Sequence, residues 1–173
     1  MGNLLFNPNG RINKGPFWQG VIVLTVLSVL MSVLSAYVSP FVSYLGIFLI
    51  YPYLCVYGKR LHDAGLTAWI FLAFLVGSLI VSFILSAILT PILAPGVTEL
   101  QAEMMENAFS GGGNPADVME MAKEVTQAAL PASIATGILS NLIVGFIAAM
   151  LKSDPNENKY GPPTSGSGQP TFE

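Results

Sequence analysis

Charged side chains are scarce in this chain of 173 residues: Asp, Glu, Lys and Arg make up 10% of it, whereas hydrophobic residues make up 53%. Soluble domains average about a quarter charged residues, so the composition predicts a membrane protein. The only cysteine, Cys55, excludes a disulfide within the chain. The only histidine, His62, is followed by Asp63, and these two residues are too few for a closed metal site.

Four apolar stretches are each about 20 residues long, which matches the roughly 30 Å hydrocarbon core of a bilayer. We expect spanning helices at residues 17–38, 41–58, 69–90 and 131–151. Pro52 should kink the second of these helices. The predicted fold is an all-α membrane protein, with four transmembrane helices in a domain of residues 17–151.

The predicted spans contain no Asp, Glu, Lys, Arg or His. Ion-coupled transporters, proton relays and voltage sensors usually carry such groups within the membrane. Their absence from the spans counts against these three classes of protein, but it does not count against a passive pore.

Polar segments flank and connect the spans. Residues 1–16 form an N-terminal arm that is polar and rich in turn residues, and we expect no cleavable signal peptide there. Residues 96–130 are expected to form an acidic insertion of two short amphipathic helices around residues 110–113. The tail, residues 152–173, is rich in Pro, Gly and Ser, and its end from residue 164 to 173 is expected to be disordered.

The cations are distributed unequally between the two sides of the predicted bundle. One side receives Arg11, Lys14, Lys59, Arg60, Lys152 and Lys159. The opposite side receives only Lys123, in the acidic insertion. The positive-inside rule then places both termini in the cytoplasm and the insertion outside.

The densest group of charges lies between the second and third spans, and Asp63 is its least expected member. A carboxylate is unfavourable near the C-terminus of a helix, so it should have a cation as partner: Arg60, Lys59, or Arg11 from the arm. We predict a cytoplasmic charged cluster of Arg11, Lys59, Arg60, His62 and Asp63. A salt-bridged structural corner is the favoured interpretation, and a proton-handling or metal-binding pair of His62 and Asp63 is the alternative.

The residues after this cluster fit a tight connection between two helices. Gly65 suits the left-handed position that ends a helix. Thr67 can cap the next helix, and Trp69 can anchor that helix at the level of the lipid headgroups.

Small residues recur at every fourth position of the fourth span, on one helix face. They are Ser133, Gly137, Asn141, Gly145 and Ala149. Small residues let helix backbones approach closely in lipid, so this face is a candidate packing stripe. Asn141 must hydrogen-bond to another helix, either within the bundle or in a second copy of the chain. Ser78, Ser82 and Ser86 form a weaker stripe in the third span.

Three stretches carry a resemblance to a known family. They are Gly10 to Lys14 followed by Phe17-Trp18, the block Arg60 to Gly65 with Trp69, and Asn158 to Pro162 in the tail. In this order around apolar spans, they resemble the bacterial inner-membrane proteins called domain of unknown function 805, or YhaH/YhaI-like. The resemblance implies a multi-pass protein of the bacterial cytoplasmic membrane and implies no activity. Because the three motifs fall on one side, we expect Arg11 or Arg60 to pair with Asp63 and the tail to pack nearby.

The sequence has no recognisable nucleophile–base pair, metal-ligand spacing or phosphate-binding loop. We therefore predict no enzyme and no cofactor, and expect a structural, accessory or assembly protein. The alternative is a small passive channel or permease for an ion or small solute, lined by Asn141 and the serines and tyrosines of the spans. Chemistry at His62 and Asp63 ranks last. The expected partners are the lipid bilayer and a protein partner or second copy, but not nucleic acid, because the cations are split among short segments.

Overall fold

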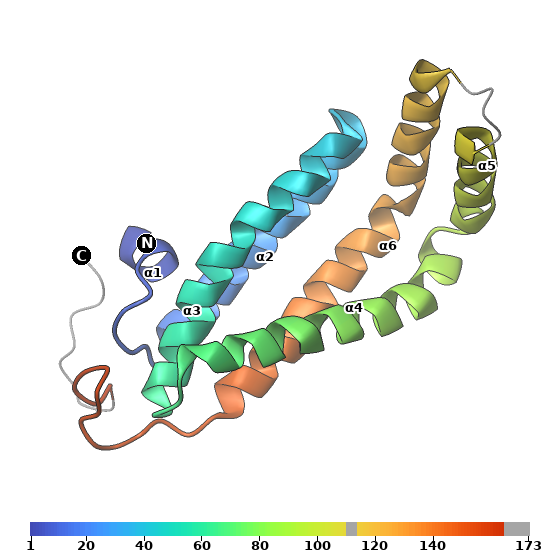
Figure 1. Cartoon of the computed structure of the whole chain (residues 1–173). Coiled ribbons are helices and arrows are strands. Elements are labelled where there is room, and N and C mark those ends of the chain that lie inside the picture. The colour runs from blue at the N-terminus through green and yellow to red at the C-terminus, as the bar shows by residue number, and fades with distance from the viewer. Residues whose placement is uncertain (110–113, 165–173) are drawn as a thin grey trace.

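The computed structural model describes residues 1–109 and 114–164, and the described residues form helices and turns, with none in a strand. Figure 1 shows long helices that lie close together near the tail and move apart towards the opposite end. Among the described residues, four helical stretches are long and apolar enough to cross a membrane, as judged by length and composition. They cover residues 14–37, 40–63, 68–93 and 115–150. The predicted all-α class is confirmed.

The N-terminal arm is partly helical and shorter than predicted. Helix α1 (Gly2–Phe6) packs against α3 through two buried leucines. Helix α2 (Lys14–Tyr37) begins before the predicted start at residue 17, because the side chain of Asn13 accepts a hydrogen bond from the backbone N–H of Gly15 at 3.1 Å. Pro16 then lies in the first helical turn, where a backbone N–H has no acceptor within the helix, so the N–H that proline lacks is not needed.

The second spanning stretch combines two kinds of helix. The 3-10 helix η1 (Pro40–Leu49) leads directly into α3 (Ile50–Asp63). Pro52 lies in the first turn of α3, so the expected kink is replaced by a change of helix type at this point. Helix α3 continues past the predicted end at residue 58, because the charged residues of its last turn are buried by protein contacts.

The connection after α3 has the predicted local structure. Gly65 adopts a φ of 73°, which is the left-handed conformation expected at the end of a helix. The side chain of Thr67 accepts a hydrogen bond from the backbone N–H of Trp69 and caps η2 (Ala68–Ile70). Helix α4 (Phe71–Leu93) follows and ends three residues beyond the predicted boundary.

The segment after α4 differs from the prediction. Helix α5 (Val97–Phe109) is the first expected amphipathic helix, but the second is continuous with the last span, in α6 (Pro115–Met150). Pro131 lies inside α6 and does not end it. Figure 1 shows that α6 changes direction along its length, as is usual where proline removes a hydrogen bond and crowds the preceding turn. The predicted break at residues 110–113 lies outside the described residues.

The tail follows α6 and folds back towards the end of α3. It consists of turns, with an isolated bridge between Asn158 and Gly161. Thr164 was expected to begin the disordered end, but it is buried. The rest of that prediction, for residues 165–173, lies outside the described residues.

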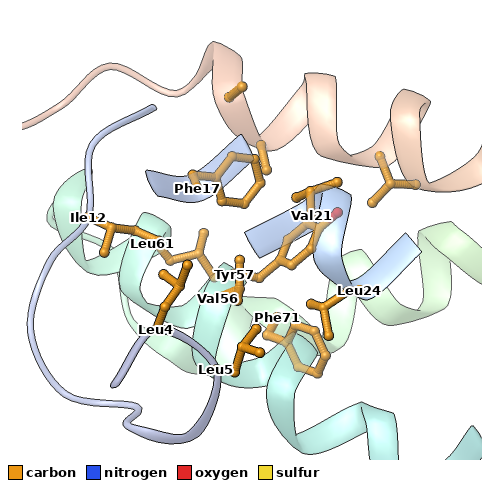
Figure 2. Close-up of a cluster of buried hydrophobic side chains, with 13 residues drawn as sticks. Leu4, Leu5, Ile12, Phe17, Val21, Leu24, Val56, Tyr57, Leu61 and Phe71 are labelled. Carbon is orange, nitrogen blue, oxygen red and sulfur yellow. The ribbon is translucent and has the colours of Figure 1, made fainter. Parts of the chain in front are cut away.

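The larger of two clusters of buried apolar side chains among the described residues lies near α1 and the tail. Figure 2 shows a cluster of buried apolar side chains there, which includes Phe17 and Tyr57. Their rings meet edge to face, with centroids 5.2 Å apart. Helix α2 crosses α3 where Gly20 faces Val56, and a Cβ atom at position 20 would lie 2.8 Å from Cγ1 of Val56. This close packing fixes the ends of the helices that carry the charged residues.

The Gly20→Ala substitution is expected to lower the thermal unfolding midpoint of the protein purified in detergent. The added methyl group overlaps Val56, and overpacking of this kind costs about 1–3 kcal/mol. Gly77→Ala in α4 is the matched control, because a Cβ atom at position 77 meets no atom within 4 Å. If both variants unfold at the wild-type midpoint, α2 and α3 do not pack as closely as described.

Candidate functional site

The predicted charged cluster assembles where the N-terminal arm, the last turn of α3 and the tail meet. Its centre is Asp63, whose side chain is fully buried. Each carboxylate oxygen has two partners. Arg60 Nη1 and the Ser153 hydroxyl donate to Oδ2 at 2.6 and 2.5 Å. The Thr164 hydroxyl and Arg11 Nε donate to Oδ1 at 2.5 and 3.4 Å. The carboxylate is therefore paired with two guanidinium groups and two hydroxyls at once.

Arg11 connects the arm to the backbone of the tail. Its guanidinium donates to the carbonyl oxygens of Asp154 at 2.6 Å, Asn156 at 2.8 Å and Gly161 at 3.2 Å. It also donates to the backbone carbonyl of Asp63 at 3.2 Å. The five N–H groups of a guanidinium radiate in a plane, so one arginine can order a turn that presents several carbonyls.

Arg60 connects α3 to the end of α6. Its Nη2 donates to the carbonyl oxygen of Leu151 and, at 3.3 Å, to that of Ala149. The last carbonyls of a helix have no partner within the helix and carry partial negative charge. Arg60 therefore caps α6 through its Nη2, while its Nη1 pairs with Asp63.

Lys59 contributes to the same end of the molecule in a different way from the prediction. Its ammonium donates to the carbonyl oxygens of Asn3 at 2.7 Å and Leu4 at 2.8 Å. These carbonyls belong to α1, so Lys59 fixes this short helix on α3. From the sequence, Lys59 was one of three predicted partners of Asp63. In the structure its ammonium donates to the backbone of α1.

The side chain of His62 lies in a separate set of contacts. Its ring stacks on that of Tyr160, with centroids 3.6 Å apart and an interplanar angle of 8°. Its Nδ1 lies 3.2 Å from the carbonyl oxygen of Gly10, and the amide of Asn158 donates to its backbone carbonyl at 3.2 Å. In the part of the chain that the structure describes, no group of three or more His, Cys, Asp or Glu residues could hold a metal ion.

Sequence reasoning missed the tail residues that complete the cluster. Ser153 and Thr164 carried no signal of their own, because their roles depend on reaching a carboxylate 90 and 101 positions away in the chain. Asp154 adds a local turn: the backbone N–H of Asn156 and the amide of Asn158 donate to its carboxylate and lower its pKa. Its own backbone N–H donates to the Asp63 carbonyl at 2.7 Å. Only the motif Asn158 to Pro162 indicated that the tail contributes.

A second feature lies between the helices, away from the charged cluster. It is a cavity of about 500 Å³ between α2, η1, α3, α4 and α6. Hydroxyl side chains from each of these elements line it, together with apolar residues and the amide of Asn141. We call it the hydroxyl-lined cavity. None of its lining residues is Asp, Glu, Lys, Arg or His.

The residues of the candidate packing stripe in α6 have two different environments: those at one end pack against other helices, and those at the other end line the cavity. At one end Ala149 is buried, and Gly145 faces Trp18 so closely that a Cβ atom would lie 3.3 Å from the indole ring. At the other end Ser133 and Gly137 line the cavity, and a Cβ atom at position 137 would meet nothing within 4 Å. Small residues therefore bring α6 onto α2 in one half of the stripe and leave space in the other.

Asn141 lies between the two halves of the stripe. Its Oδ1 accepts a hydrogen bond from the Tyr53 hydroxyl at 3.1 Å, and that hydroxyl also lies 3.3 Å from the hydroxyl of Ser28. The partner expected for Asn141 is thus found within the bundle. On α4, the Ser82 hydroxyl donates to that of Ser140 at 2.9 Å, so polar side chains also join α4 to α6.

Replacing Asp63 by alanine should destabilise the protein strongly, because two buried guanidinium groups lose their counter-ion. Removing one member of a buried ion pair costs about 3–5 kcal/mol. The measurement is the thermal unfolding midpoint in detergent, and Asp117→Ala, at an exposed position in the first turn of α6, is the matched control. An Asp63→Ala variant as stable as this control would show that the cluster does not hold the arm and tail in place.

Comparison with known proteins identifies a family match. No curated protein and no solved structure matches the chain. The model of a family described as "Protein of unknown function (DUF805)" matches residues 5–162, which include most of the arm, the four spanning stretches and the tail up to Pro162. The match runs from α1 to the turn that Arg11 holds, so it includes all five residues of the predicted charged cluster. The chain belongs to the DUF805 family, as its three motifs predicted.

Proposed function

We propose that this chain is a non-catalytic, multi-pass protein of the bacterial cytoplasmic membrane with a structural, accessory or assembly role. One observation carries the proposal: the polar groups that could perform chemistry are engaged in holding the chain together. Both oxygens of Asp63 accept from side chains of the arm, α3 and the tail. His62 is held between Tyr160 and the carbonyl of Gly10. A group that serves as a structural partner on every side is poorly placed to bind a substrate.

Length and composition of the helices support the membrane placement. In the third spanning stretch none of the most apolar window is buried inside the protein, and the exposed side chains of α4 include Leu79, Ile80 and Phe83. Apolar side chains exposed in such numbers mark contact with lipid or with another protein. The lipid bilayer is thus the first partner that we propose, and a protein or second copy is the next.

The distribution of cations supports a cytoplasmic position for both termini. Six of the seven cations lie near the charged cluster or in the arm and tail, and only Lys123 lies elsewhere, near the start of α6 and at the other end of that helix from the tail. Figure 1 shows α5 and the start of α6 at the end of the bundle away from the tail. With cations retained on the inner side, this end faces outward. A reporter inserted between α5 and α6 that is active only in the cytoplasm would overturn the orientation.

Co-purification in mild detergent tests the accessory role. Full-length protein with an affinity tag should retain a partner in fixed stoichiometry, or purify as a defined oligomer of its own. Asp63→Ala should lose this association together with its stability, whereas Asp117→Ala should keep it. Two results would contradict the proposal. The first is a wild-type protein that purifies as a monomer without a partner. The second is an Asp63→Asn variant that folds and associates normally but fails to complement a strain from which the gene has been deleted.

A passive channel or permease is the second candidate, because the hydroxyl-lined cavity brings together the polar residues of the spans. Ser28, Tyr53, Ser82 and Asn141 all line it. One observation counts against a continuous path: Tyr57 and Phe71, which line the cavity on the side of the apolar cluster, are almost fully buried. Solute flux into liposomes that contain the wild-type protein, absent from liposomes with an Asn141→Leu variant, would favour this candidate over the first.

A further inference from the structure

The shape of the hydroxyl-lined cavity suits a molecule with a head and a tail. Its volume of about 500 Å³ lies within the roughly 300–1,000 Å³ of ligand sites. Along α6 the lining residues extend from Thr126 to Val144, which at 1.5 Å per residue is a length of about 27 Å. The cavity is therefore long relative to its volume.

The aromatic side chains gather at one end of this space. Tyr57 lies with its ring centroid 5.7 Å from that of Phe74, 6.2 Å from that of Phe71 and 6.2 Å from that of Tyr53. All four residues line the cavity. Aromatic faces favour contact with a flat ring, so this end is suited to a planar head group. The remaining length, towards Thr126, is lined by apolar residues such as Met31 and by hydroxyls that donate to the protein's own backbone, as those of Thr126 and Ser133 do, so it can hold a flexible apolar tail.

The lining selects an uncharged ligand. Its residues provide no counter-ion, and burying an unpaired charge in such a site is costly. The serine hydroxyls mostly donate to backbone carbonyls, as Ser28 does to Leu24 at 2.9 Å and Ser78 to Leu75 at 2.7 Å. They therefore make the wall mildly polar without requiring a donor or acceptor from the ligand.

Asn141 supplies the directional contact. Because its Oδ1 accepts from the Tyr53 hydroxyl, its Nδ2 is directed elsewhere, and among the described residues this nitrogen has no hydrogen-bond acceptor. Asn141 lines the cavity close to the aromatic end. An amide N–H in an apolar setting needs an acceptor, and a ligand carbonyl oxygen at this depth would provide it.

The cavity is placed so that a ligand can enter from the bilayer. Figure 1 shows that α3 and α4 move apart from their shared turn, and residues of η1, α3 and α4 line the cavity between them. Ser28 and Ser82 lie near the middle of their spanning stretches, and Asn141 lies at a similar depth, because the Tyr53 hydroxyl connects it to Ser28. Phospholipid carbonyls lie at the interface of a bilayer, so a carbonyl at this depth belongs to a lipid without a polar headgroup.

We propose that the hydroxyl-lined cavity binds a lipid-soluble quinone, with the ring against Tyr53, Tyr57 and Phe74, a carbonyl oxygen on the Asn141 amide, and the apolar tail along α6. The inference concerns binding alone and includes no redox step. It rests on the membrane placement proposed above, but it does not depend on any protein partner.

The test uses full-length protein in detergent and decylubiquinone as the probe, with binding measured by equilibrium dialysis. The wild type should bind saturably with a stoichiometry of one. Asn141→Leu should weaken binding about tenfold, which corresponds to about 1.4 kcal/mol, the loss of one good hydrogen bond. Decylbenzene, which has the tail but no carbonyl, should bind as weakly to the wild type as decylubiquinone does to the variant.

A pair of glycine variants separates binding from folding. Gly137→Leu should fill the cavity and abolish binding, because a side chain at position 137 enters the space without meeting another atom within 4 Å. Gly77→Leu places the same side chain at a position of α4 that is equally open and does not line the cavity, so it should bind like the wild type. Both variants should unfold at temperatures close to that of the wild type.

Several outcomes would overturn the assignment. They are no saturable binding to the wild type, equal binding by Gly137→Leu, equal affinity for decylbenzene, and displacement of the probe by excess phospholipid. Failure of the membrane placement itself would be visible separately, since the purified chain would then remain a compact monomer in buffer without detergent. Loss of a protein partner in co-purification would leave this binding result unchanged.

Discussion

A buried carboxylate between two guanidinium groups is the interaction on which the rest of the structure depends. Asp63 is inaccessible to solvent, and Arg11 and Arg60 reach it from the arm and from its own helix. Charges in such a place are costly unless every lone pair and every N–H has a partner. Backbone carbonyls of the tail and two hydroxyls supply most of these partners, although Nε of Arg60 is buried without a hydrogen-bond partner among the described residues. Satisfying this carboxylate therefore fixes the path of three separate segments.

Two polar regions of the molecule differ in their chemistry. The charged cluster lies where α1, α3 and the tail meet, and its members pair with one another or with backbone carbonyls. Neutral hydroxyls and one amide lie further along the helices, around a cavity. Between the two regions, Phe17, Tyr57 and Phe71 form part of the apolar cluster shown in Figure 2. This apolar layer separates the charged cluster from the hydroxyl-lined cavity.

Local signals in the sequence predicted local structure, and they failed where distant segments decide. Gly65 and Thr67 identified the end of one helix and the start of the next, because each acts within a few residues of itself. The fourth span was predicted to begin at residue 131, whereas α6 begins at Pro115 and runs through Pro131, since proline is tolerated inside a membrane helix. The hydroxyl of Thr164 and the space beside Gly137 had no local signature. Both depend on which segments of the chain become neighbours in the fold. The residue pattern within one segment carries no information about those neighbours.

The contacts of Arg11 have a consequence for the order in which the chain can assemble. Synthesis makes the arm and α3 first, and the residues that complete the shell around Asp63 come from positions 153 to 164, near the end of the matched region. Until the ribosome has released that last stretch, the carboxylate lacks two of its four donors, and Arg11 has no tail carbonyls to bind. The charged cluster can therefore close only after residues 153–164 have been synthesised, and a product truncated before them lacks both hydroxyl donors to Asp63 and the tail carbonyls that bind Arg11.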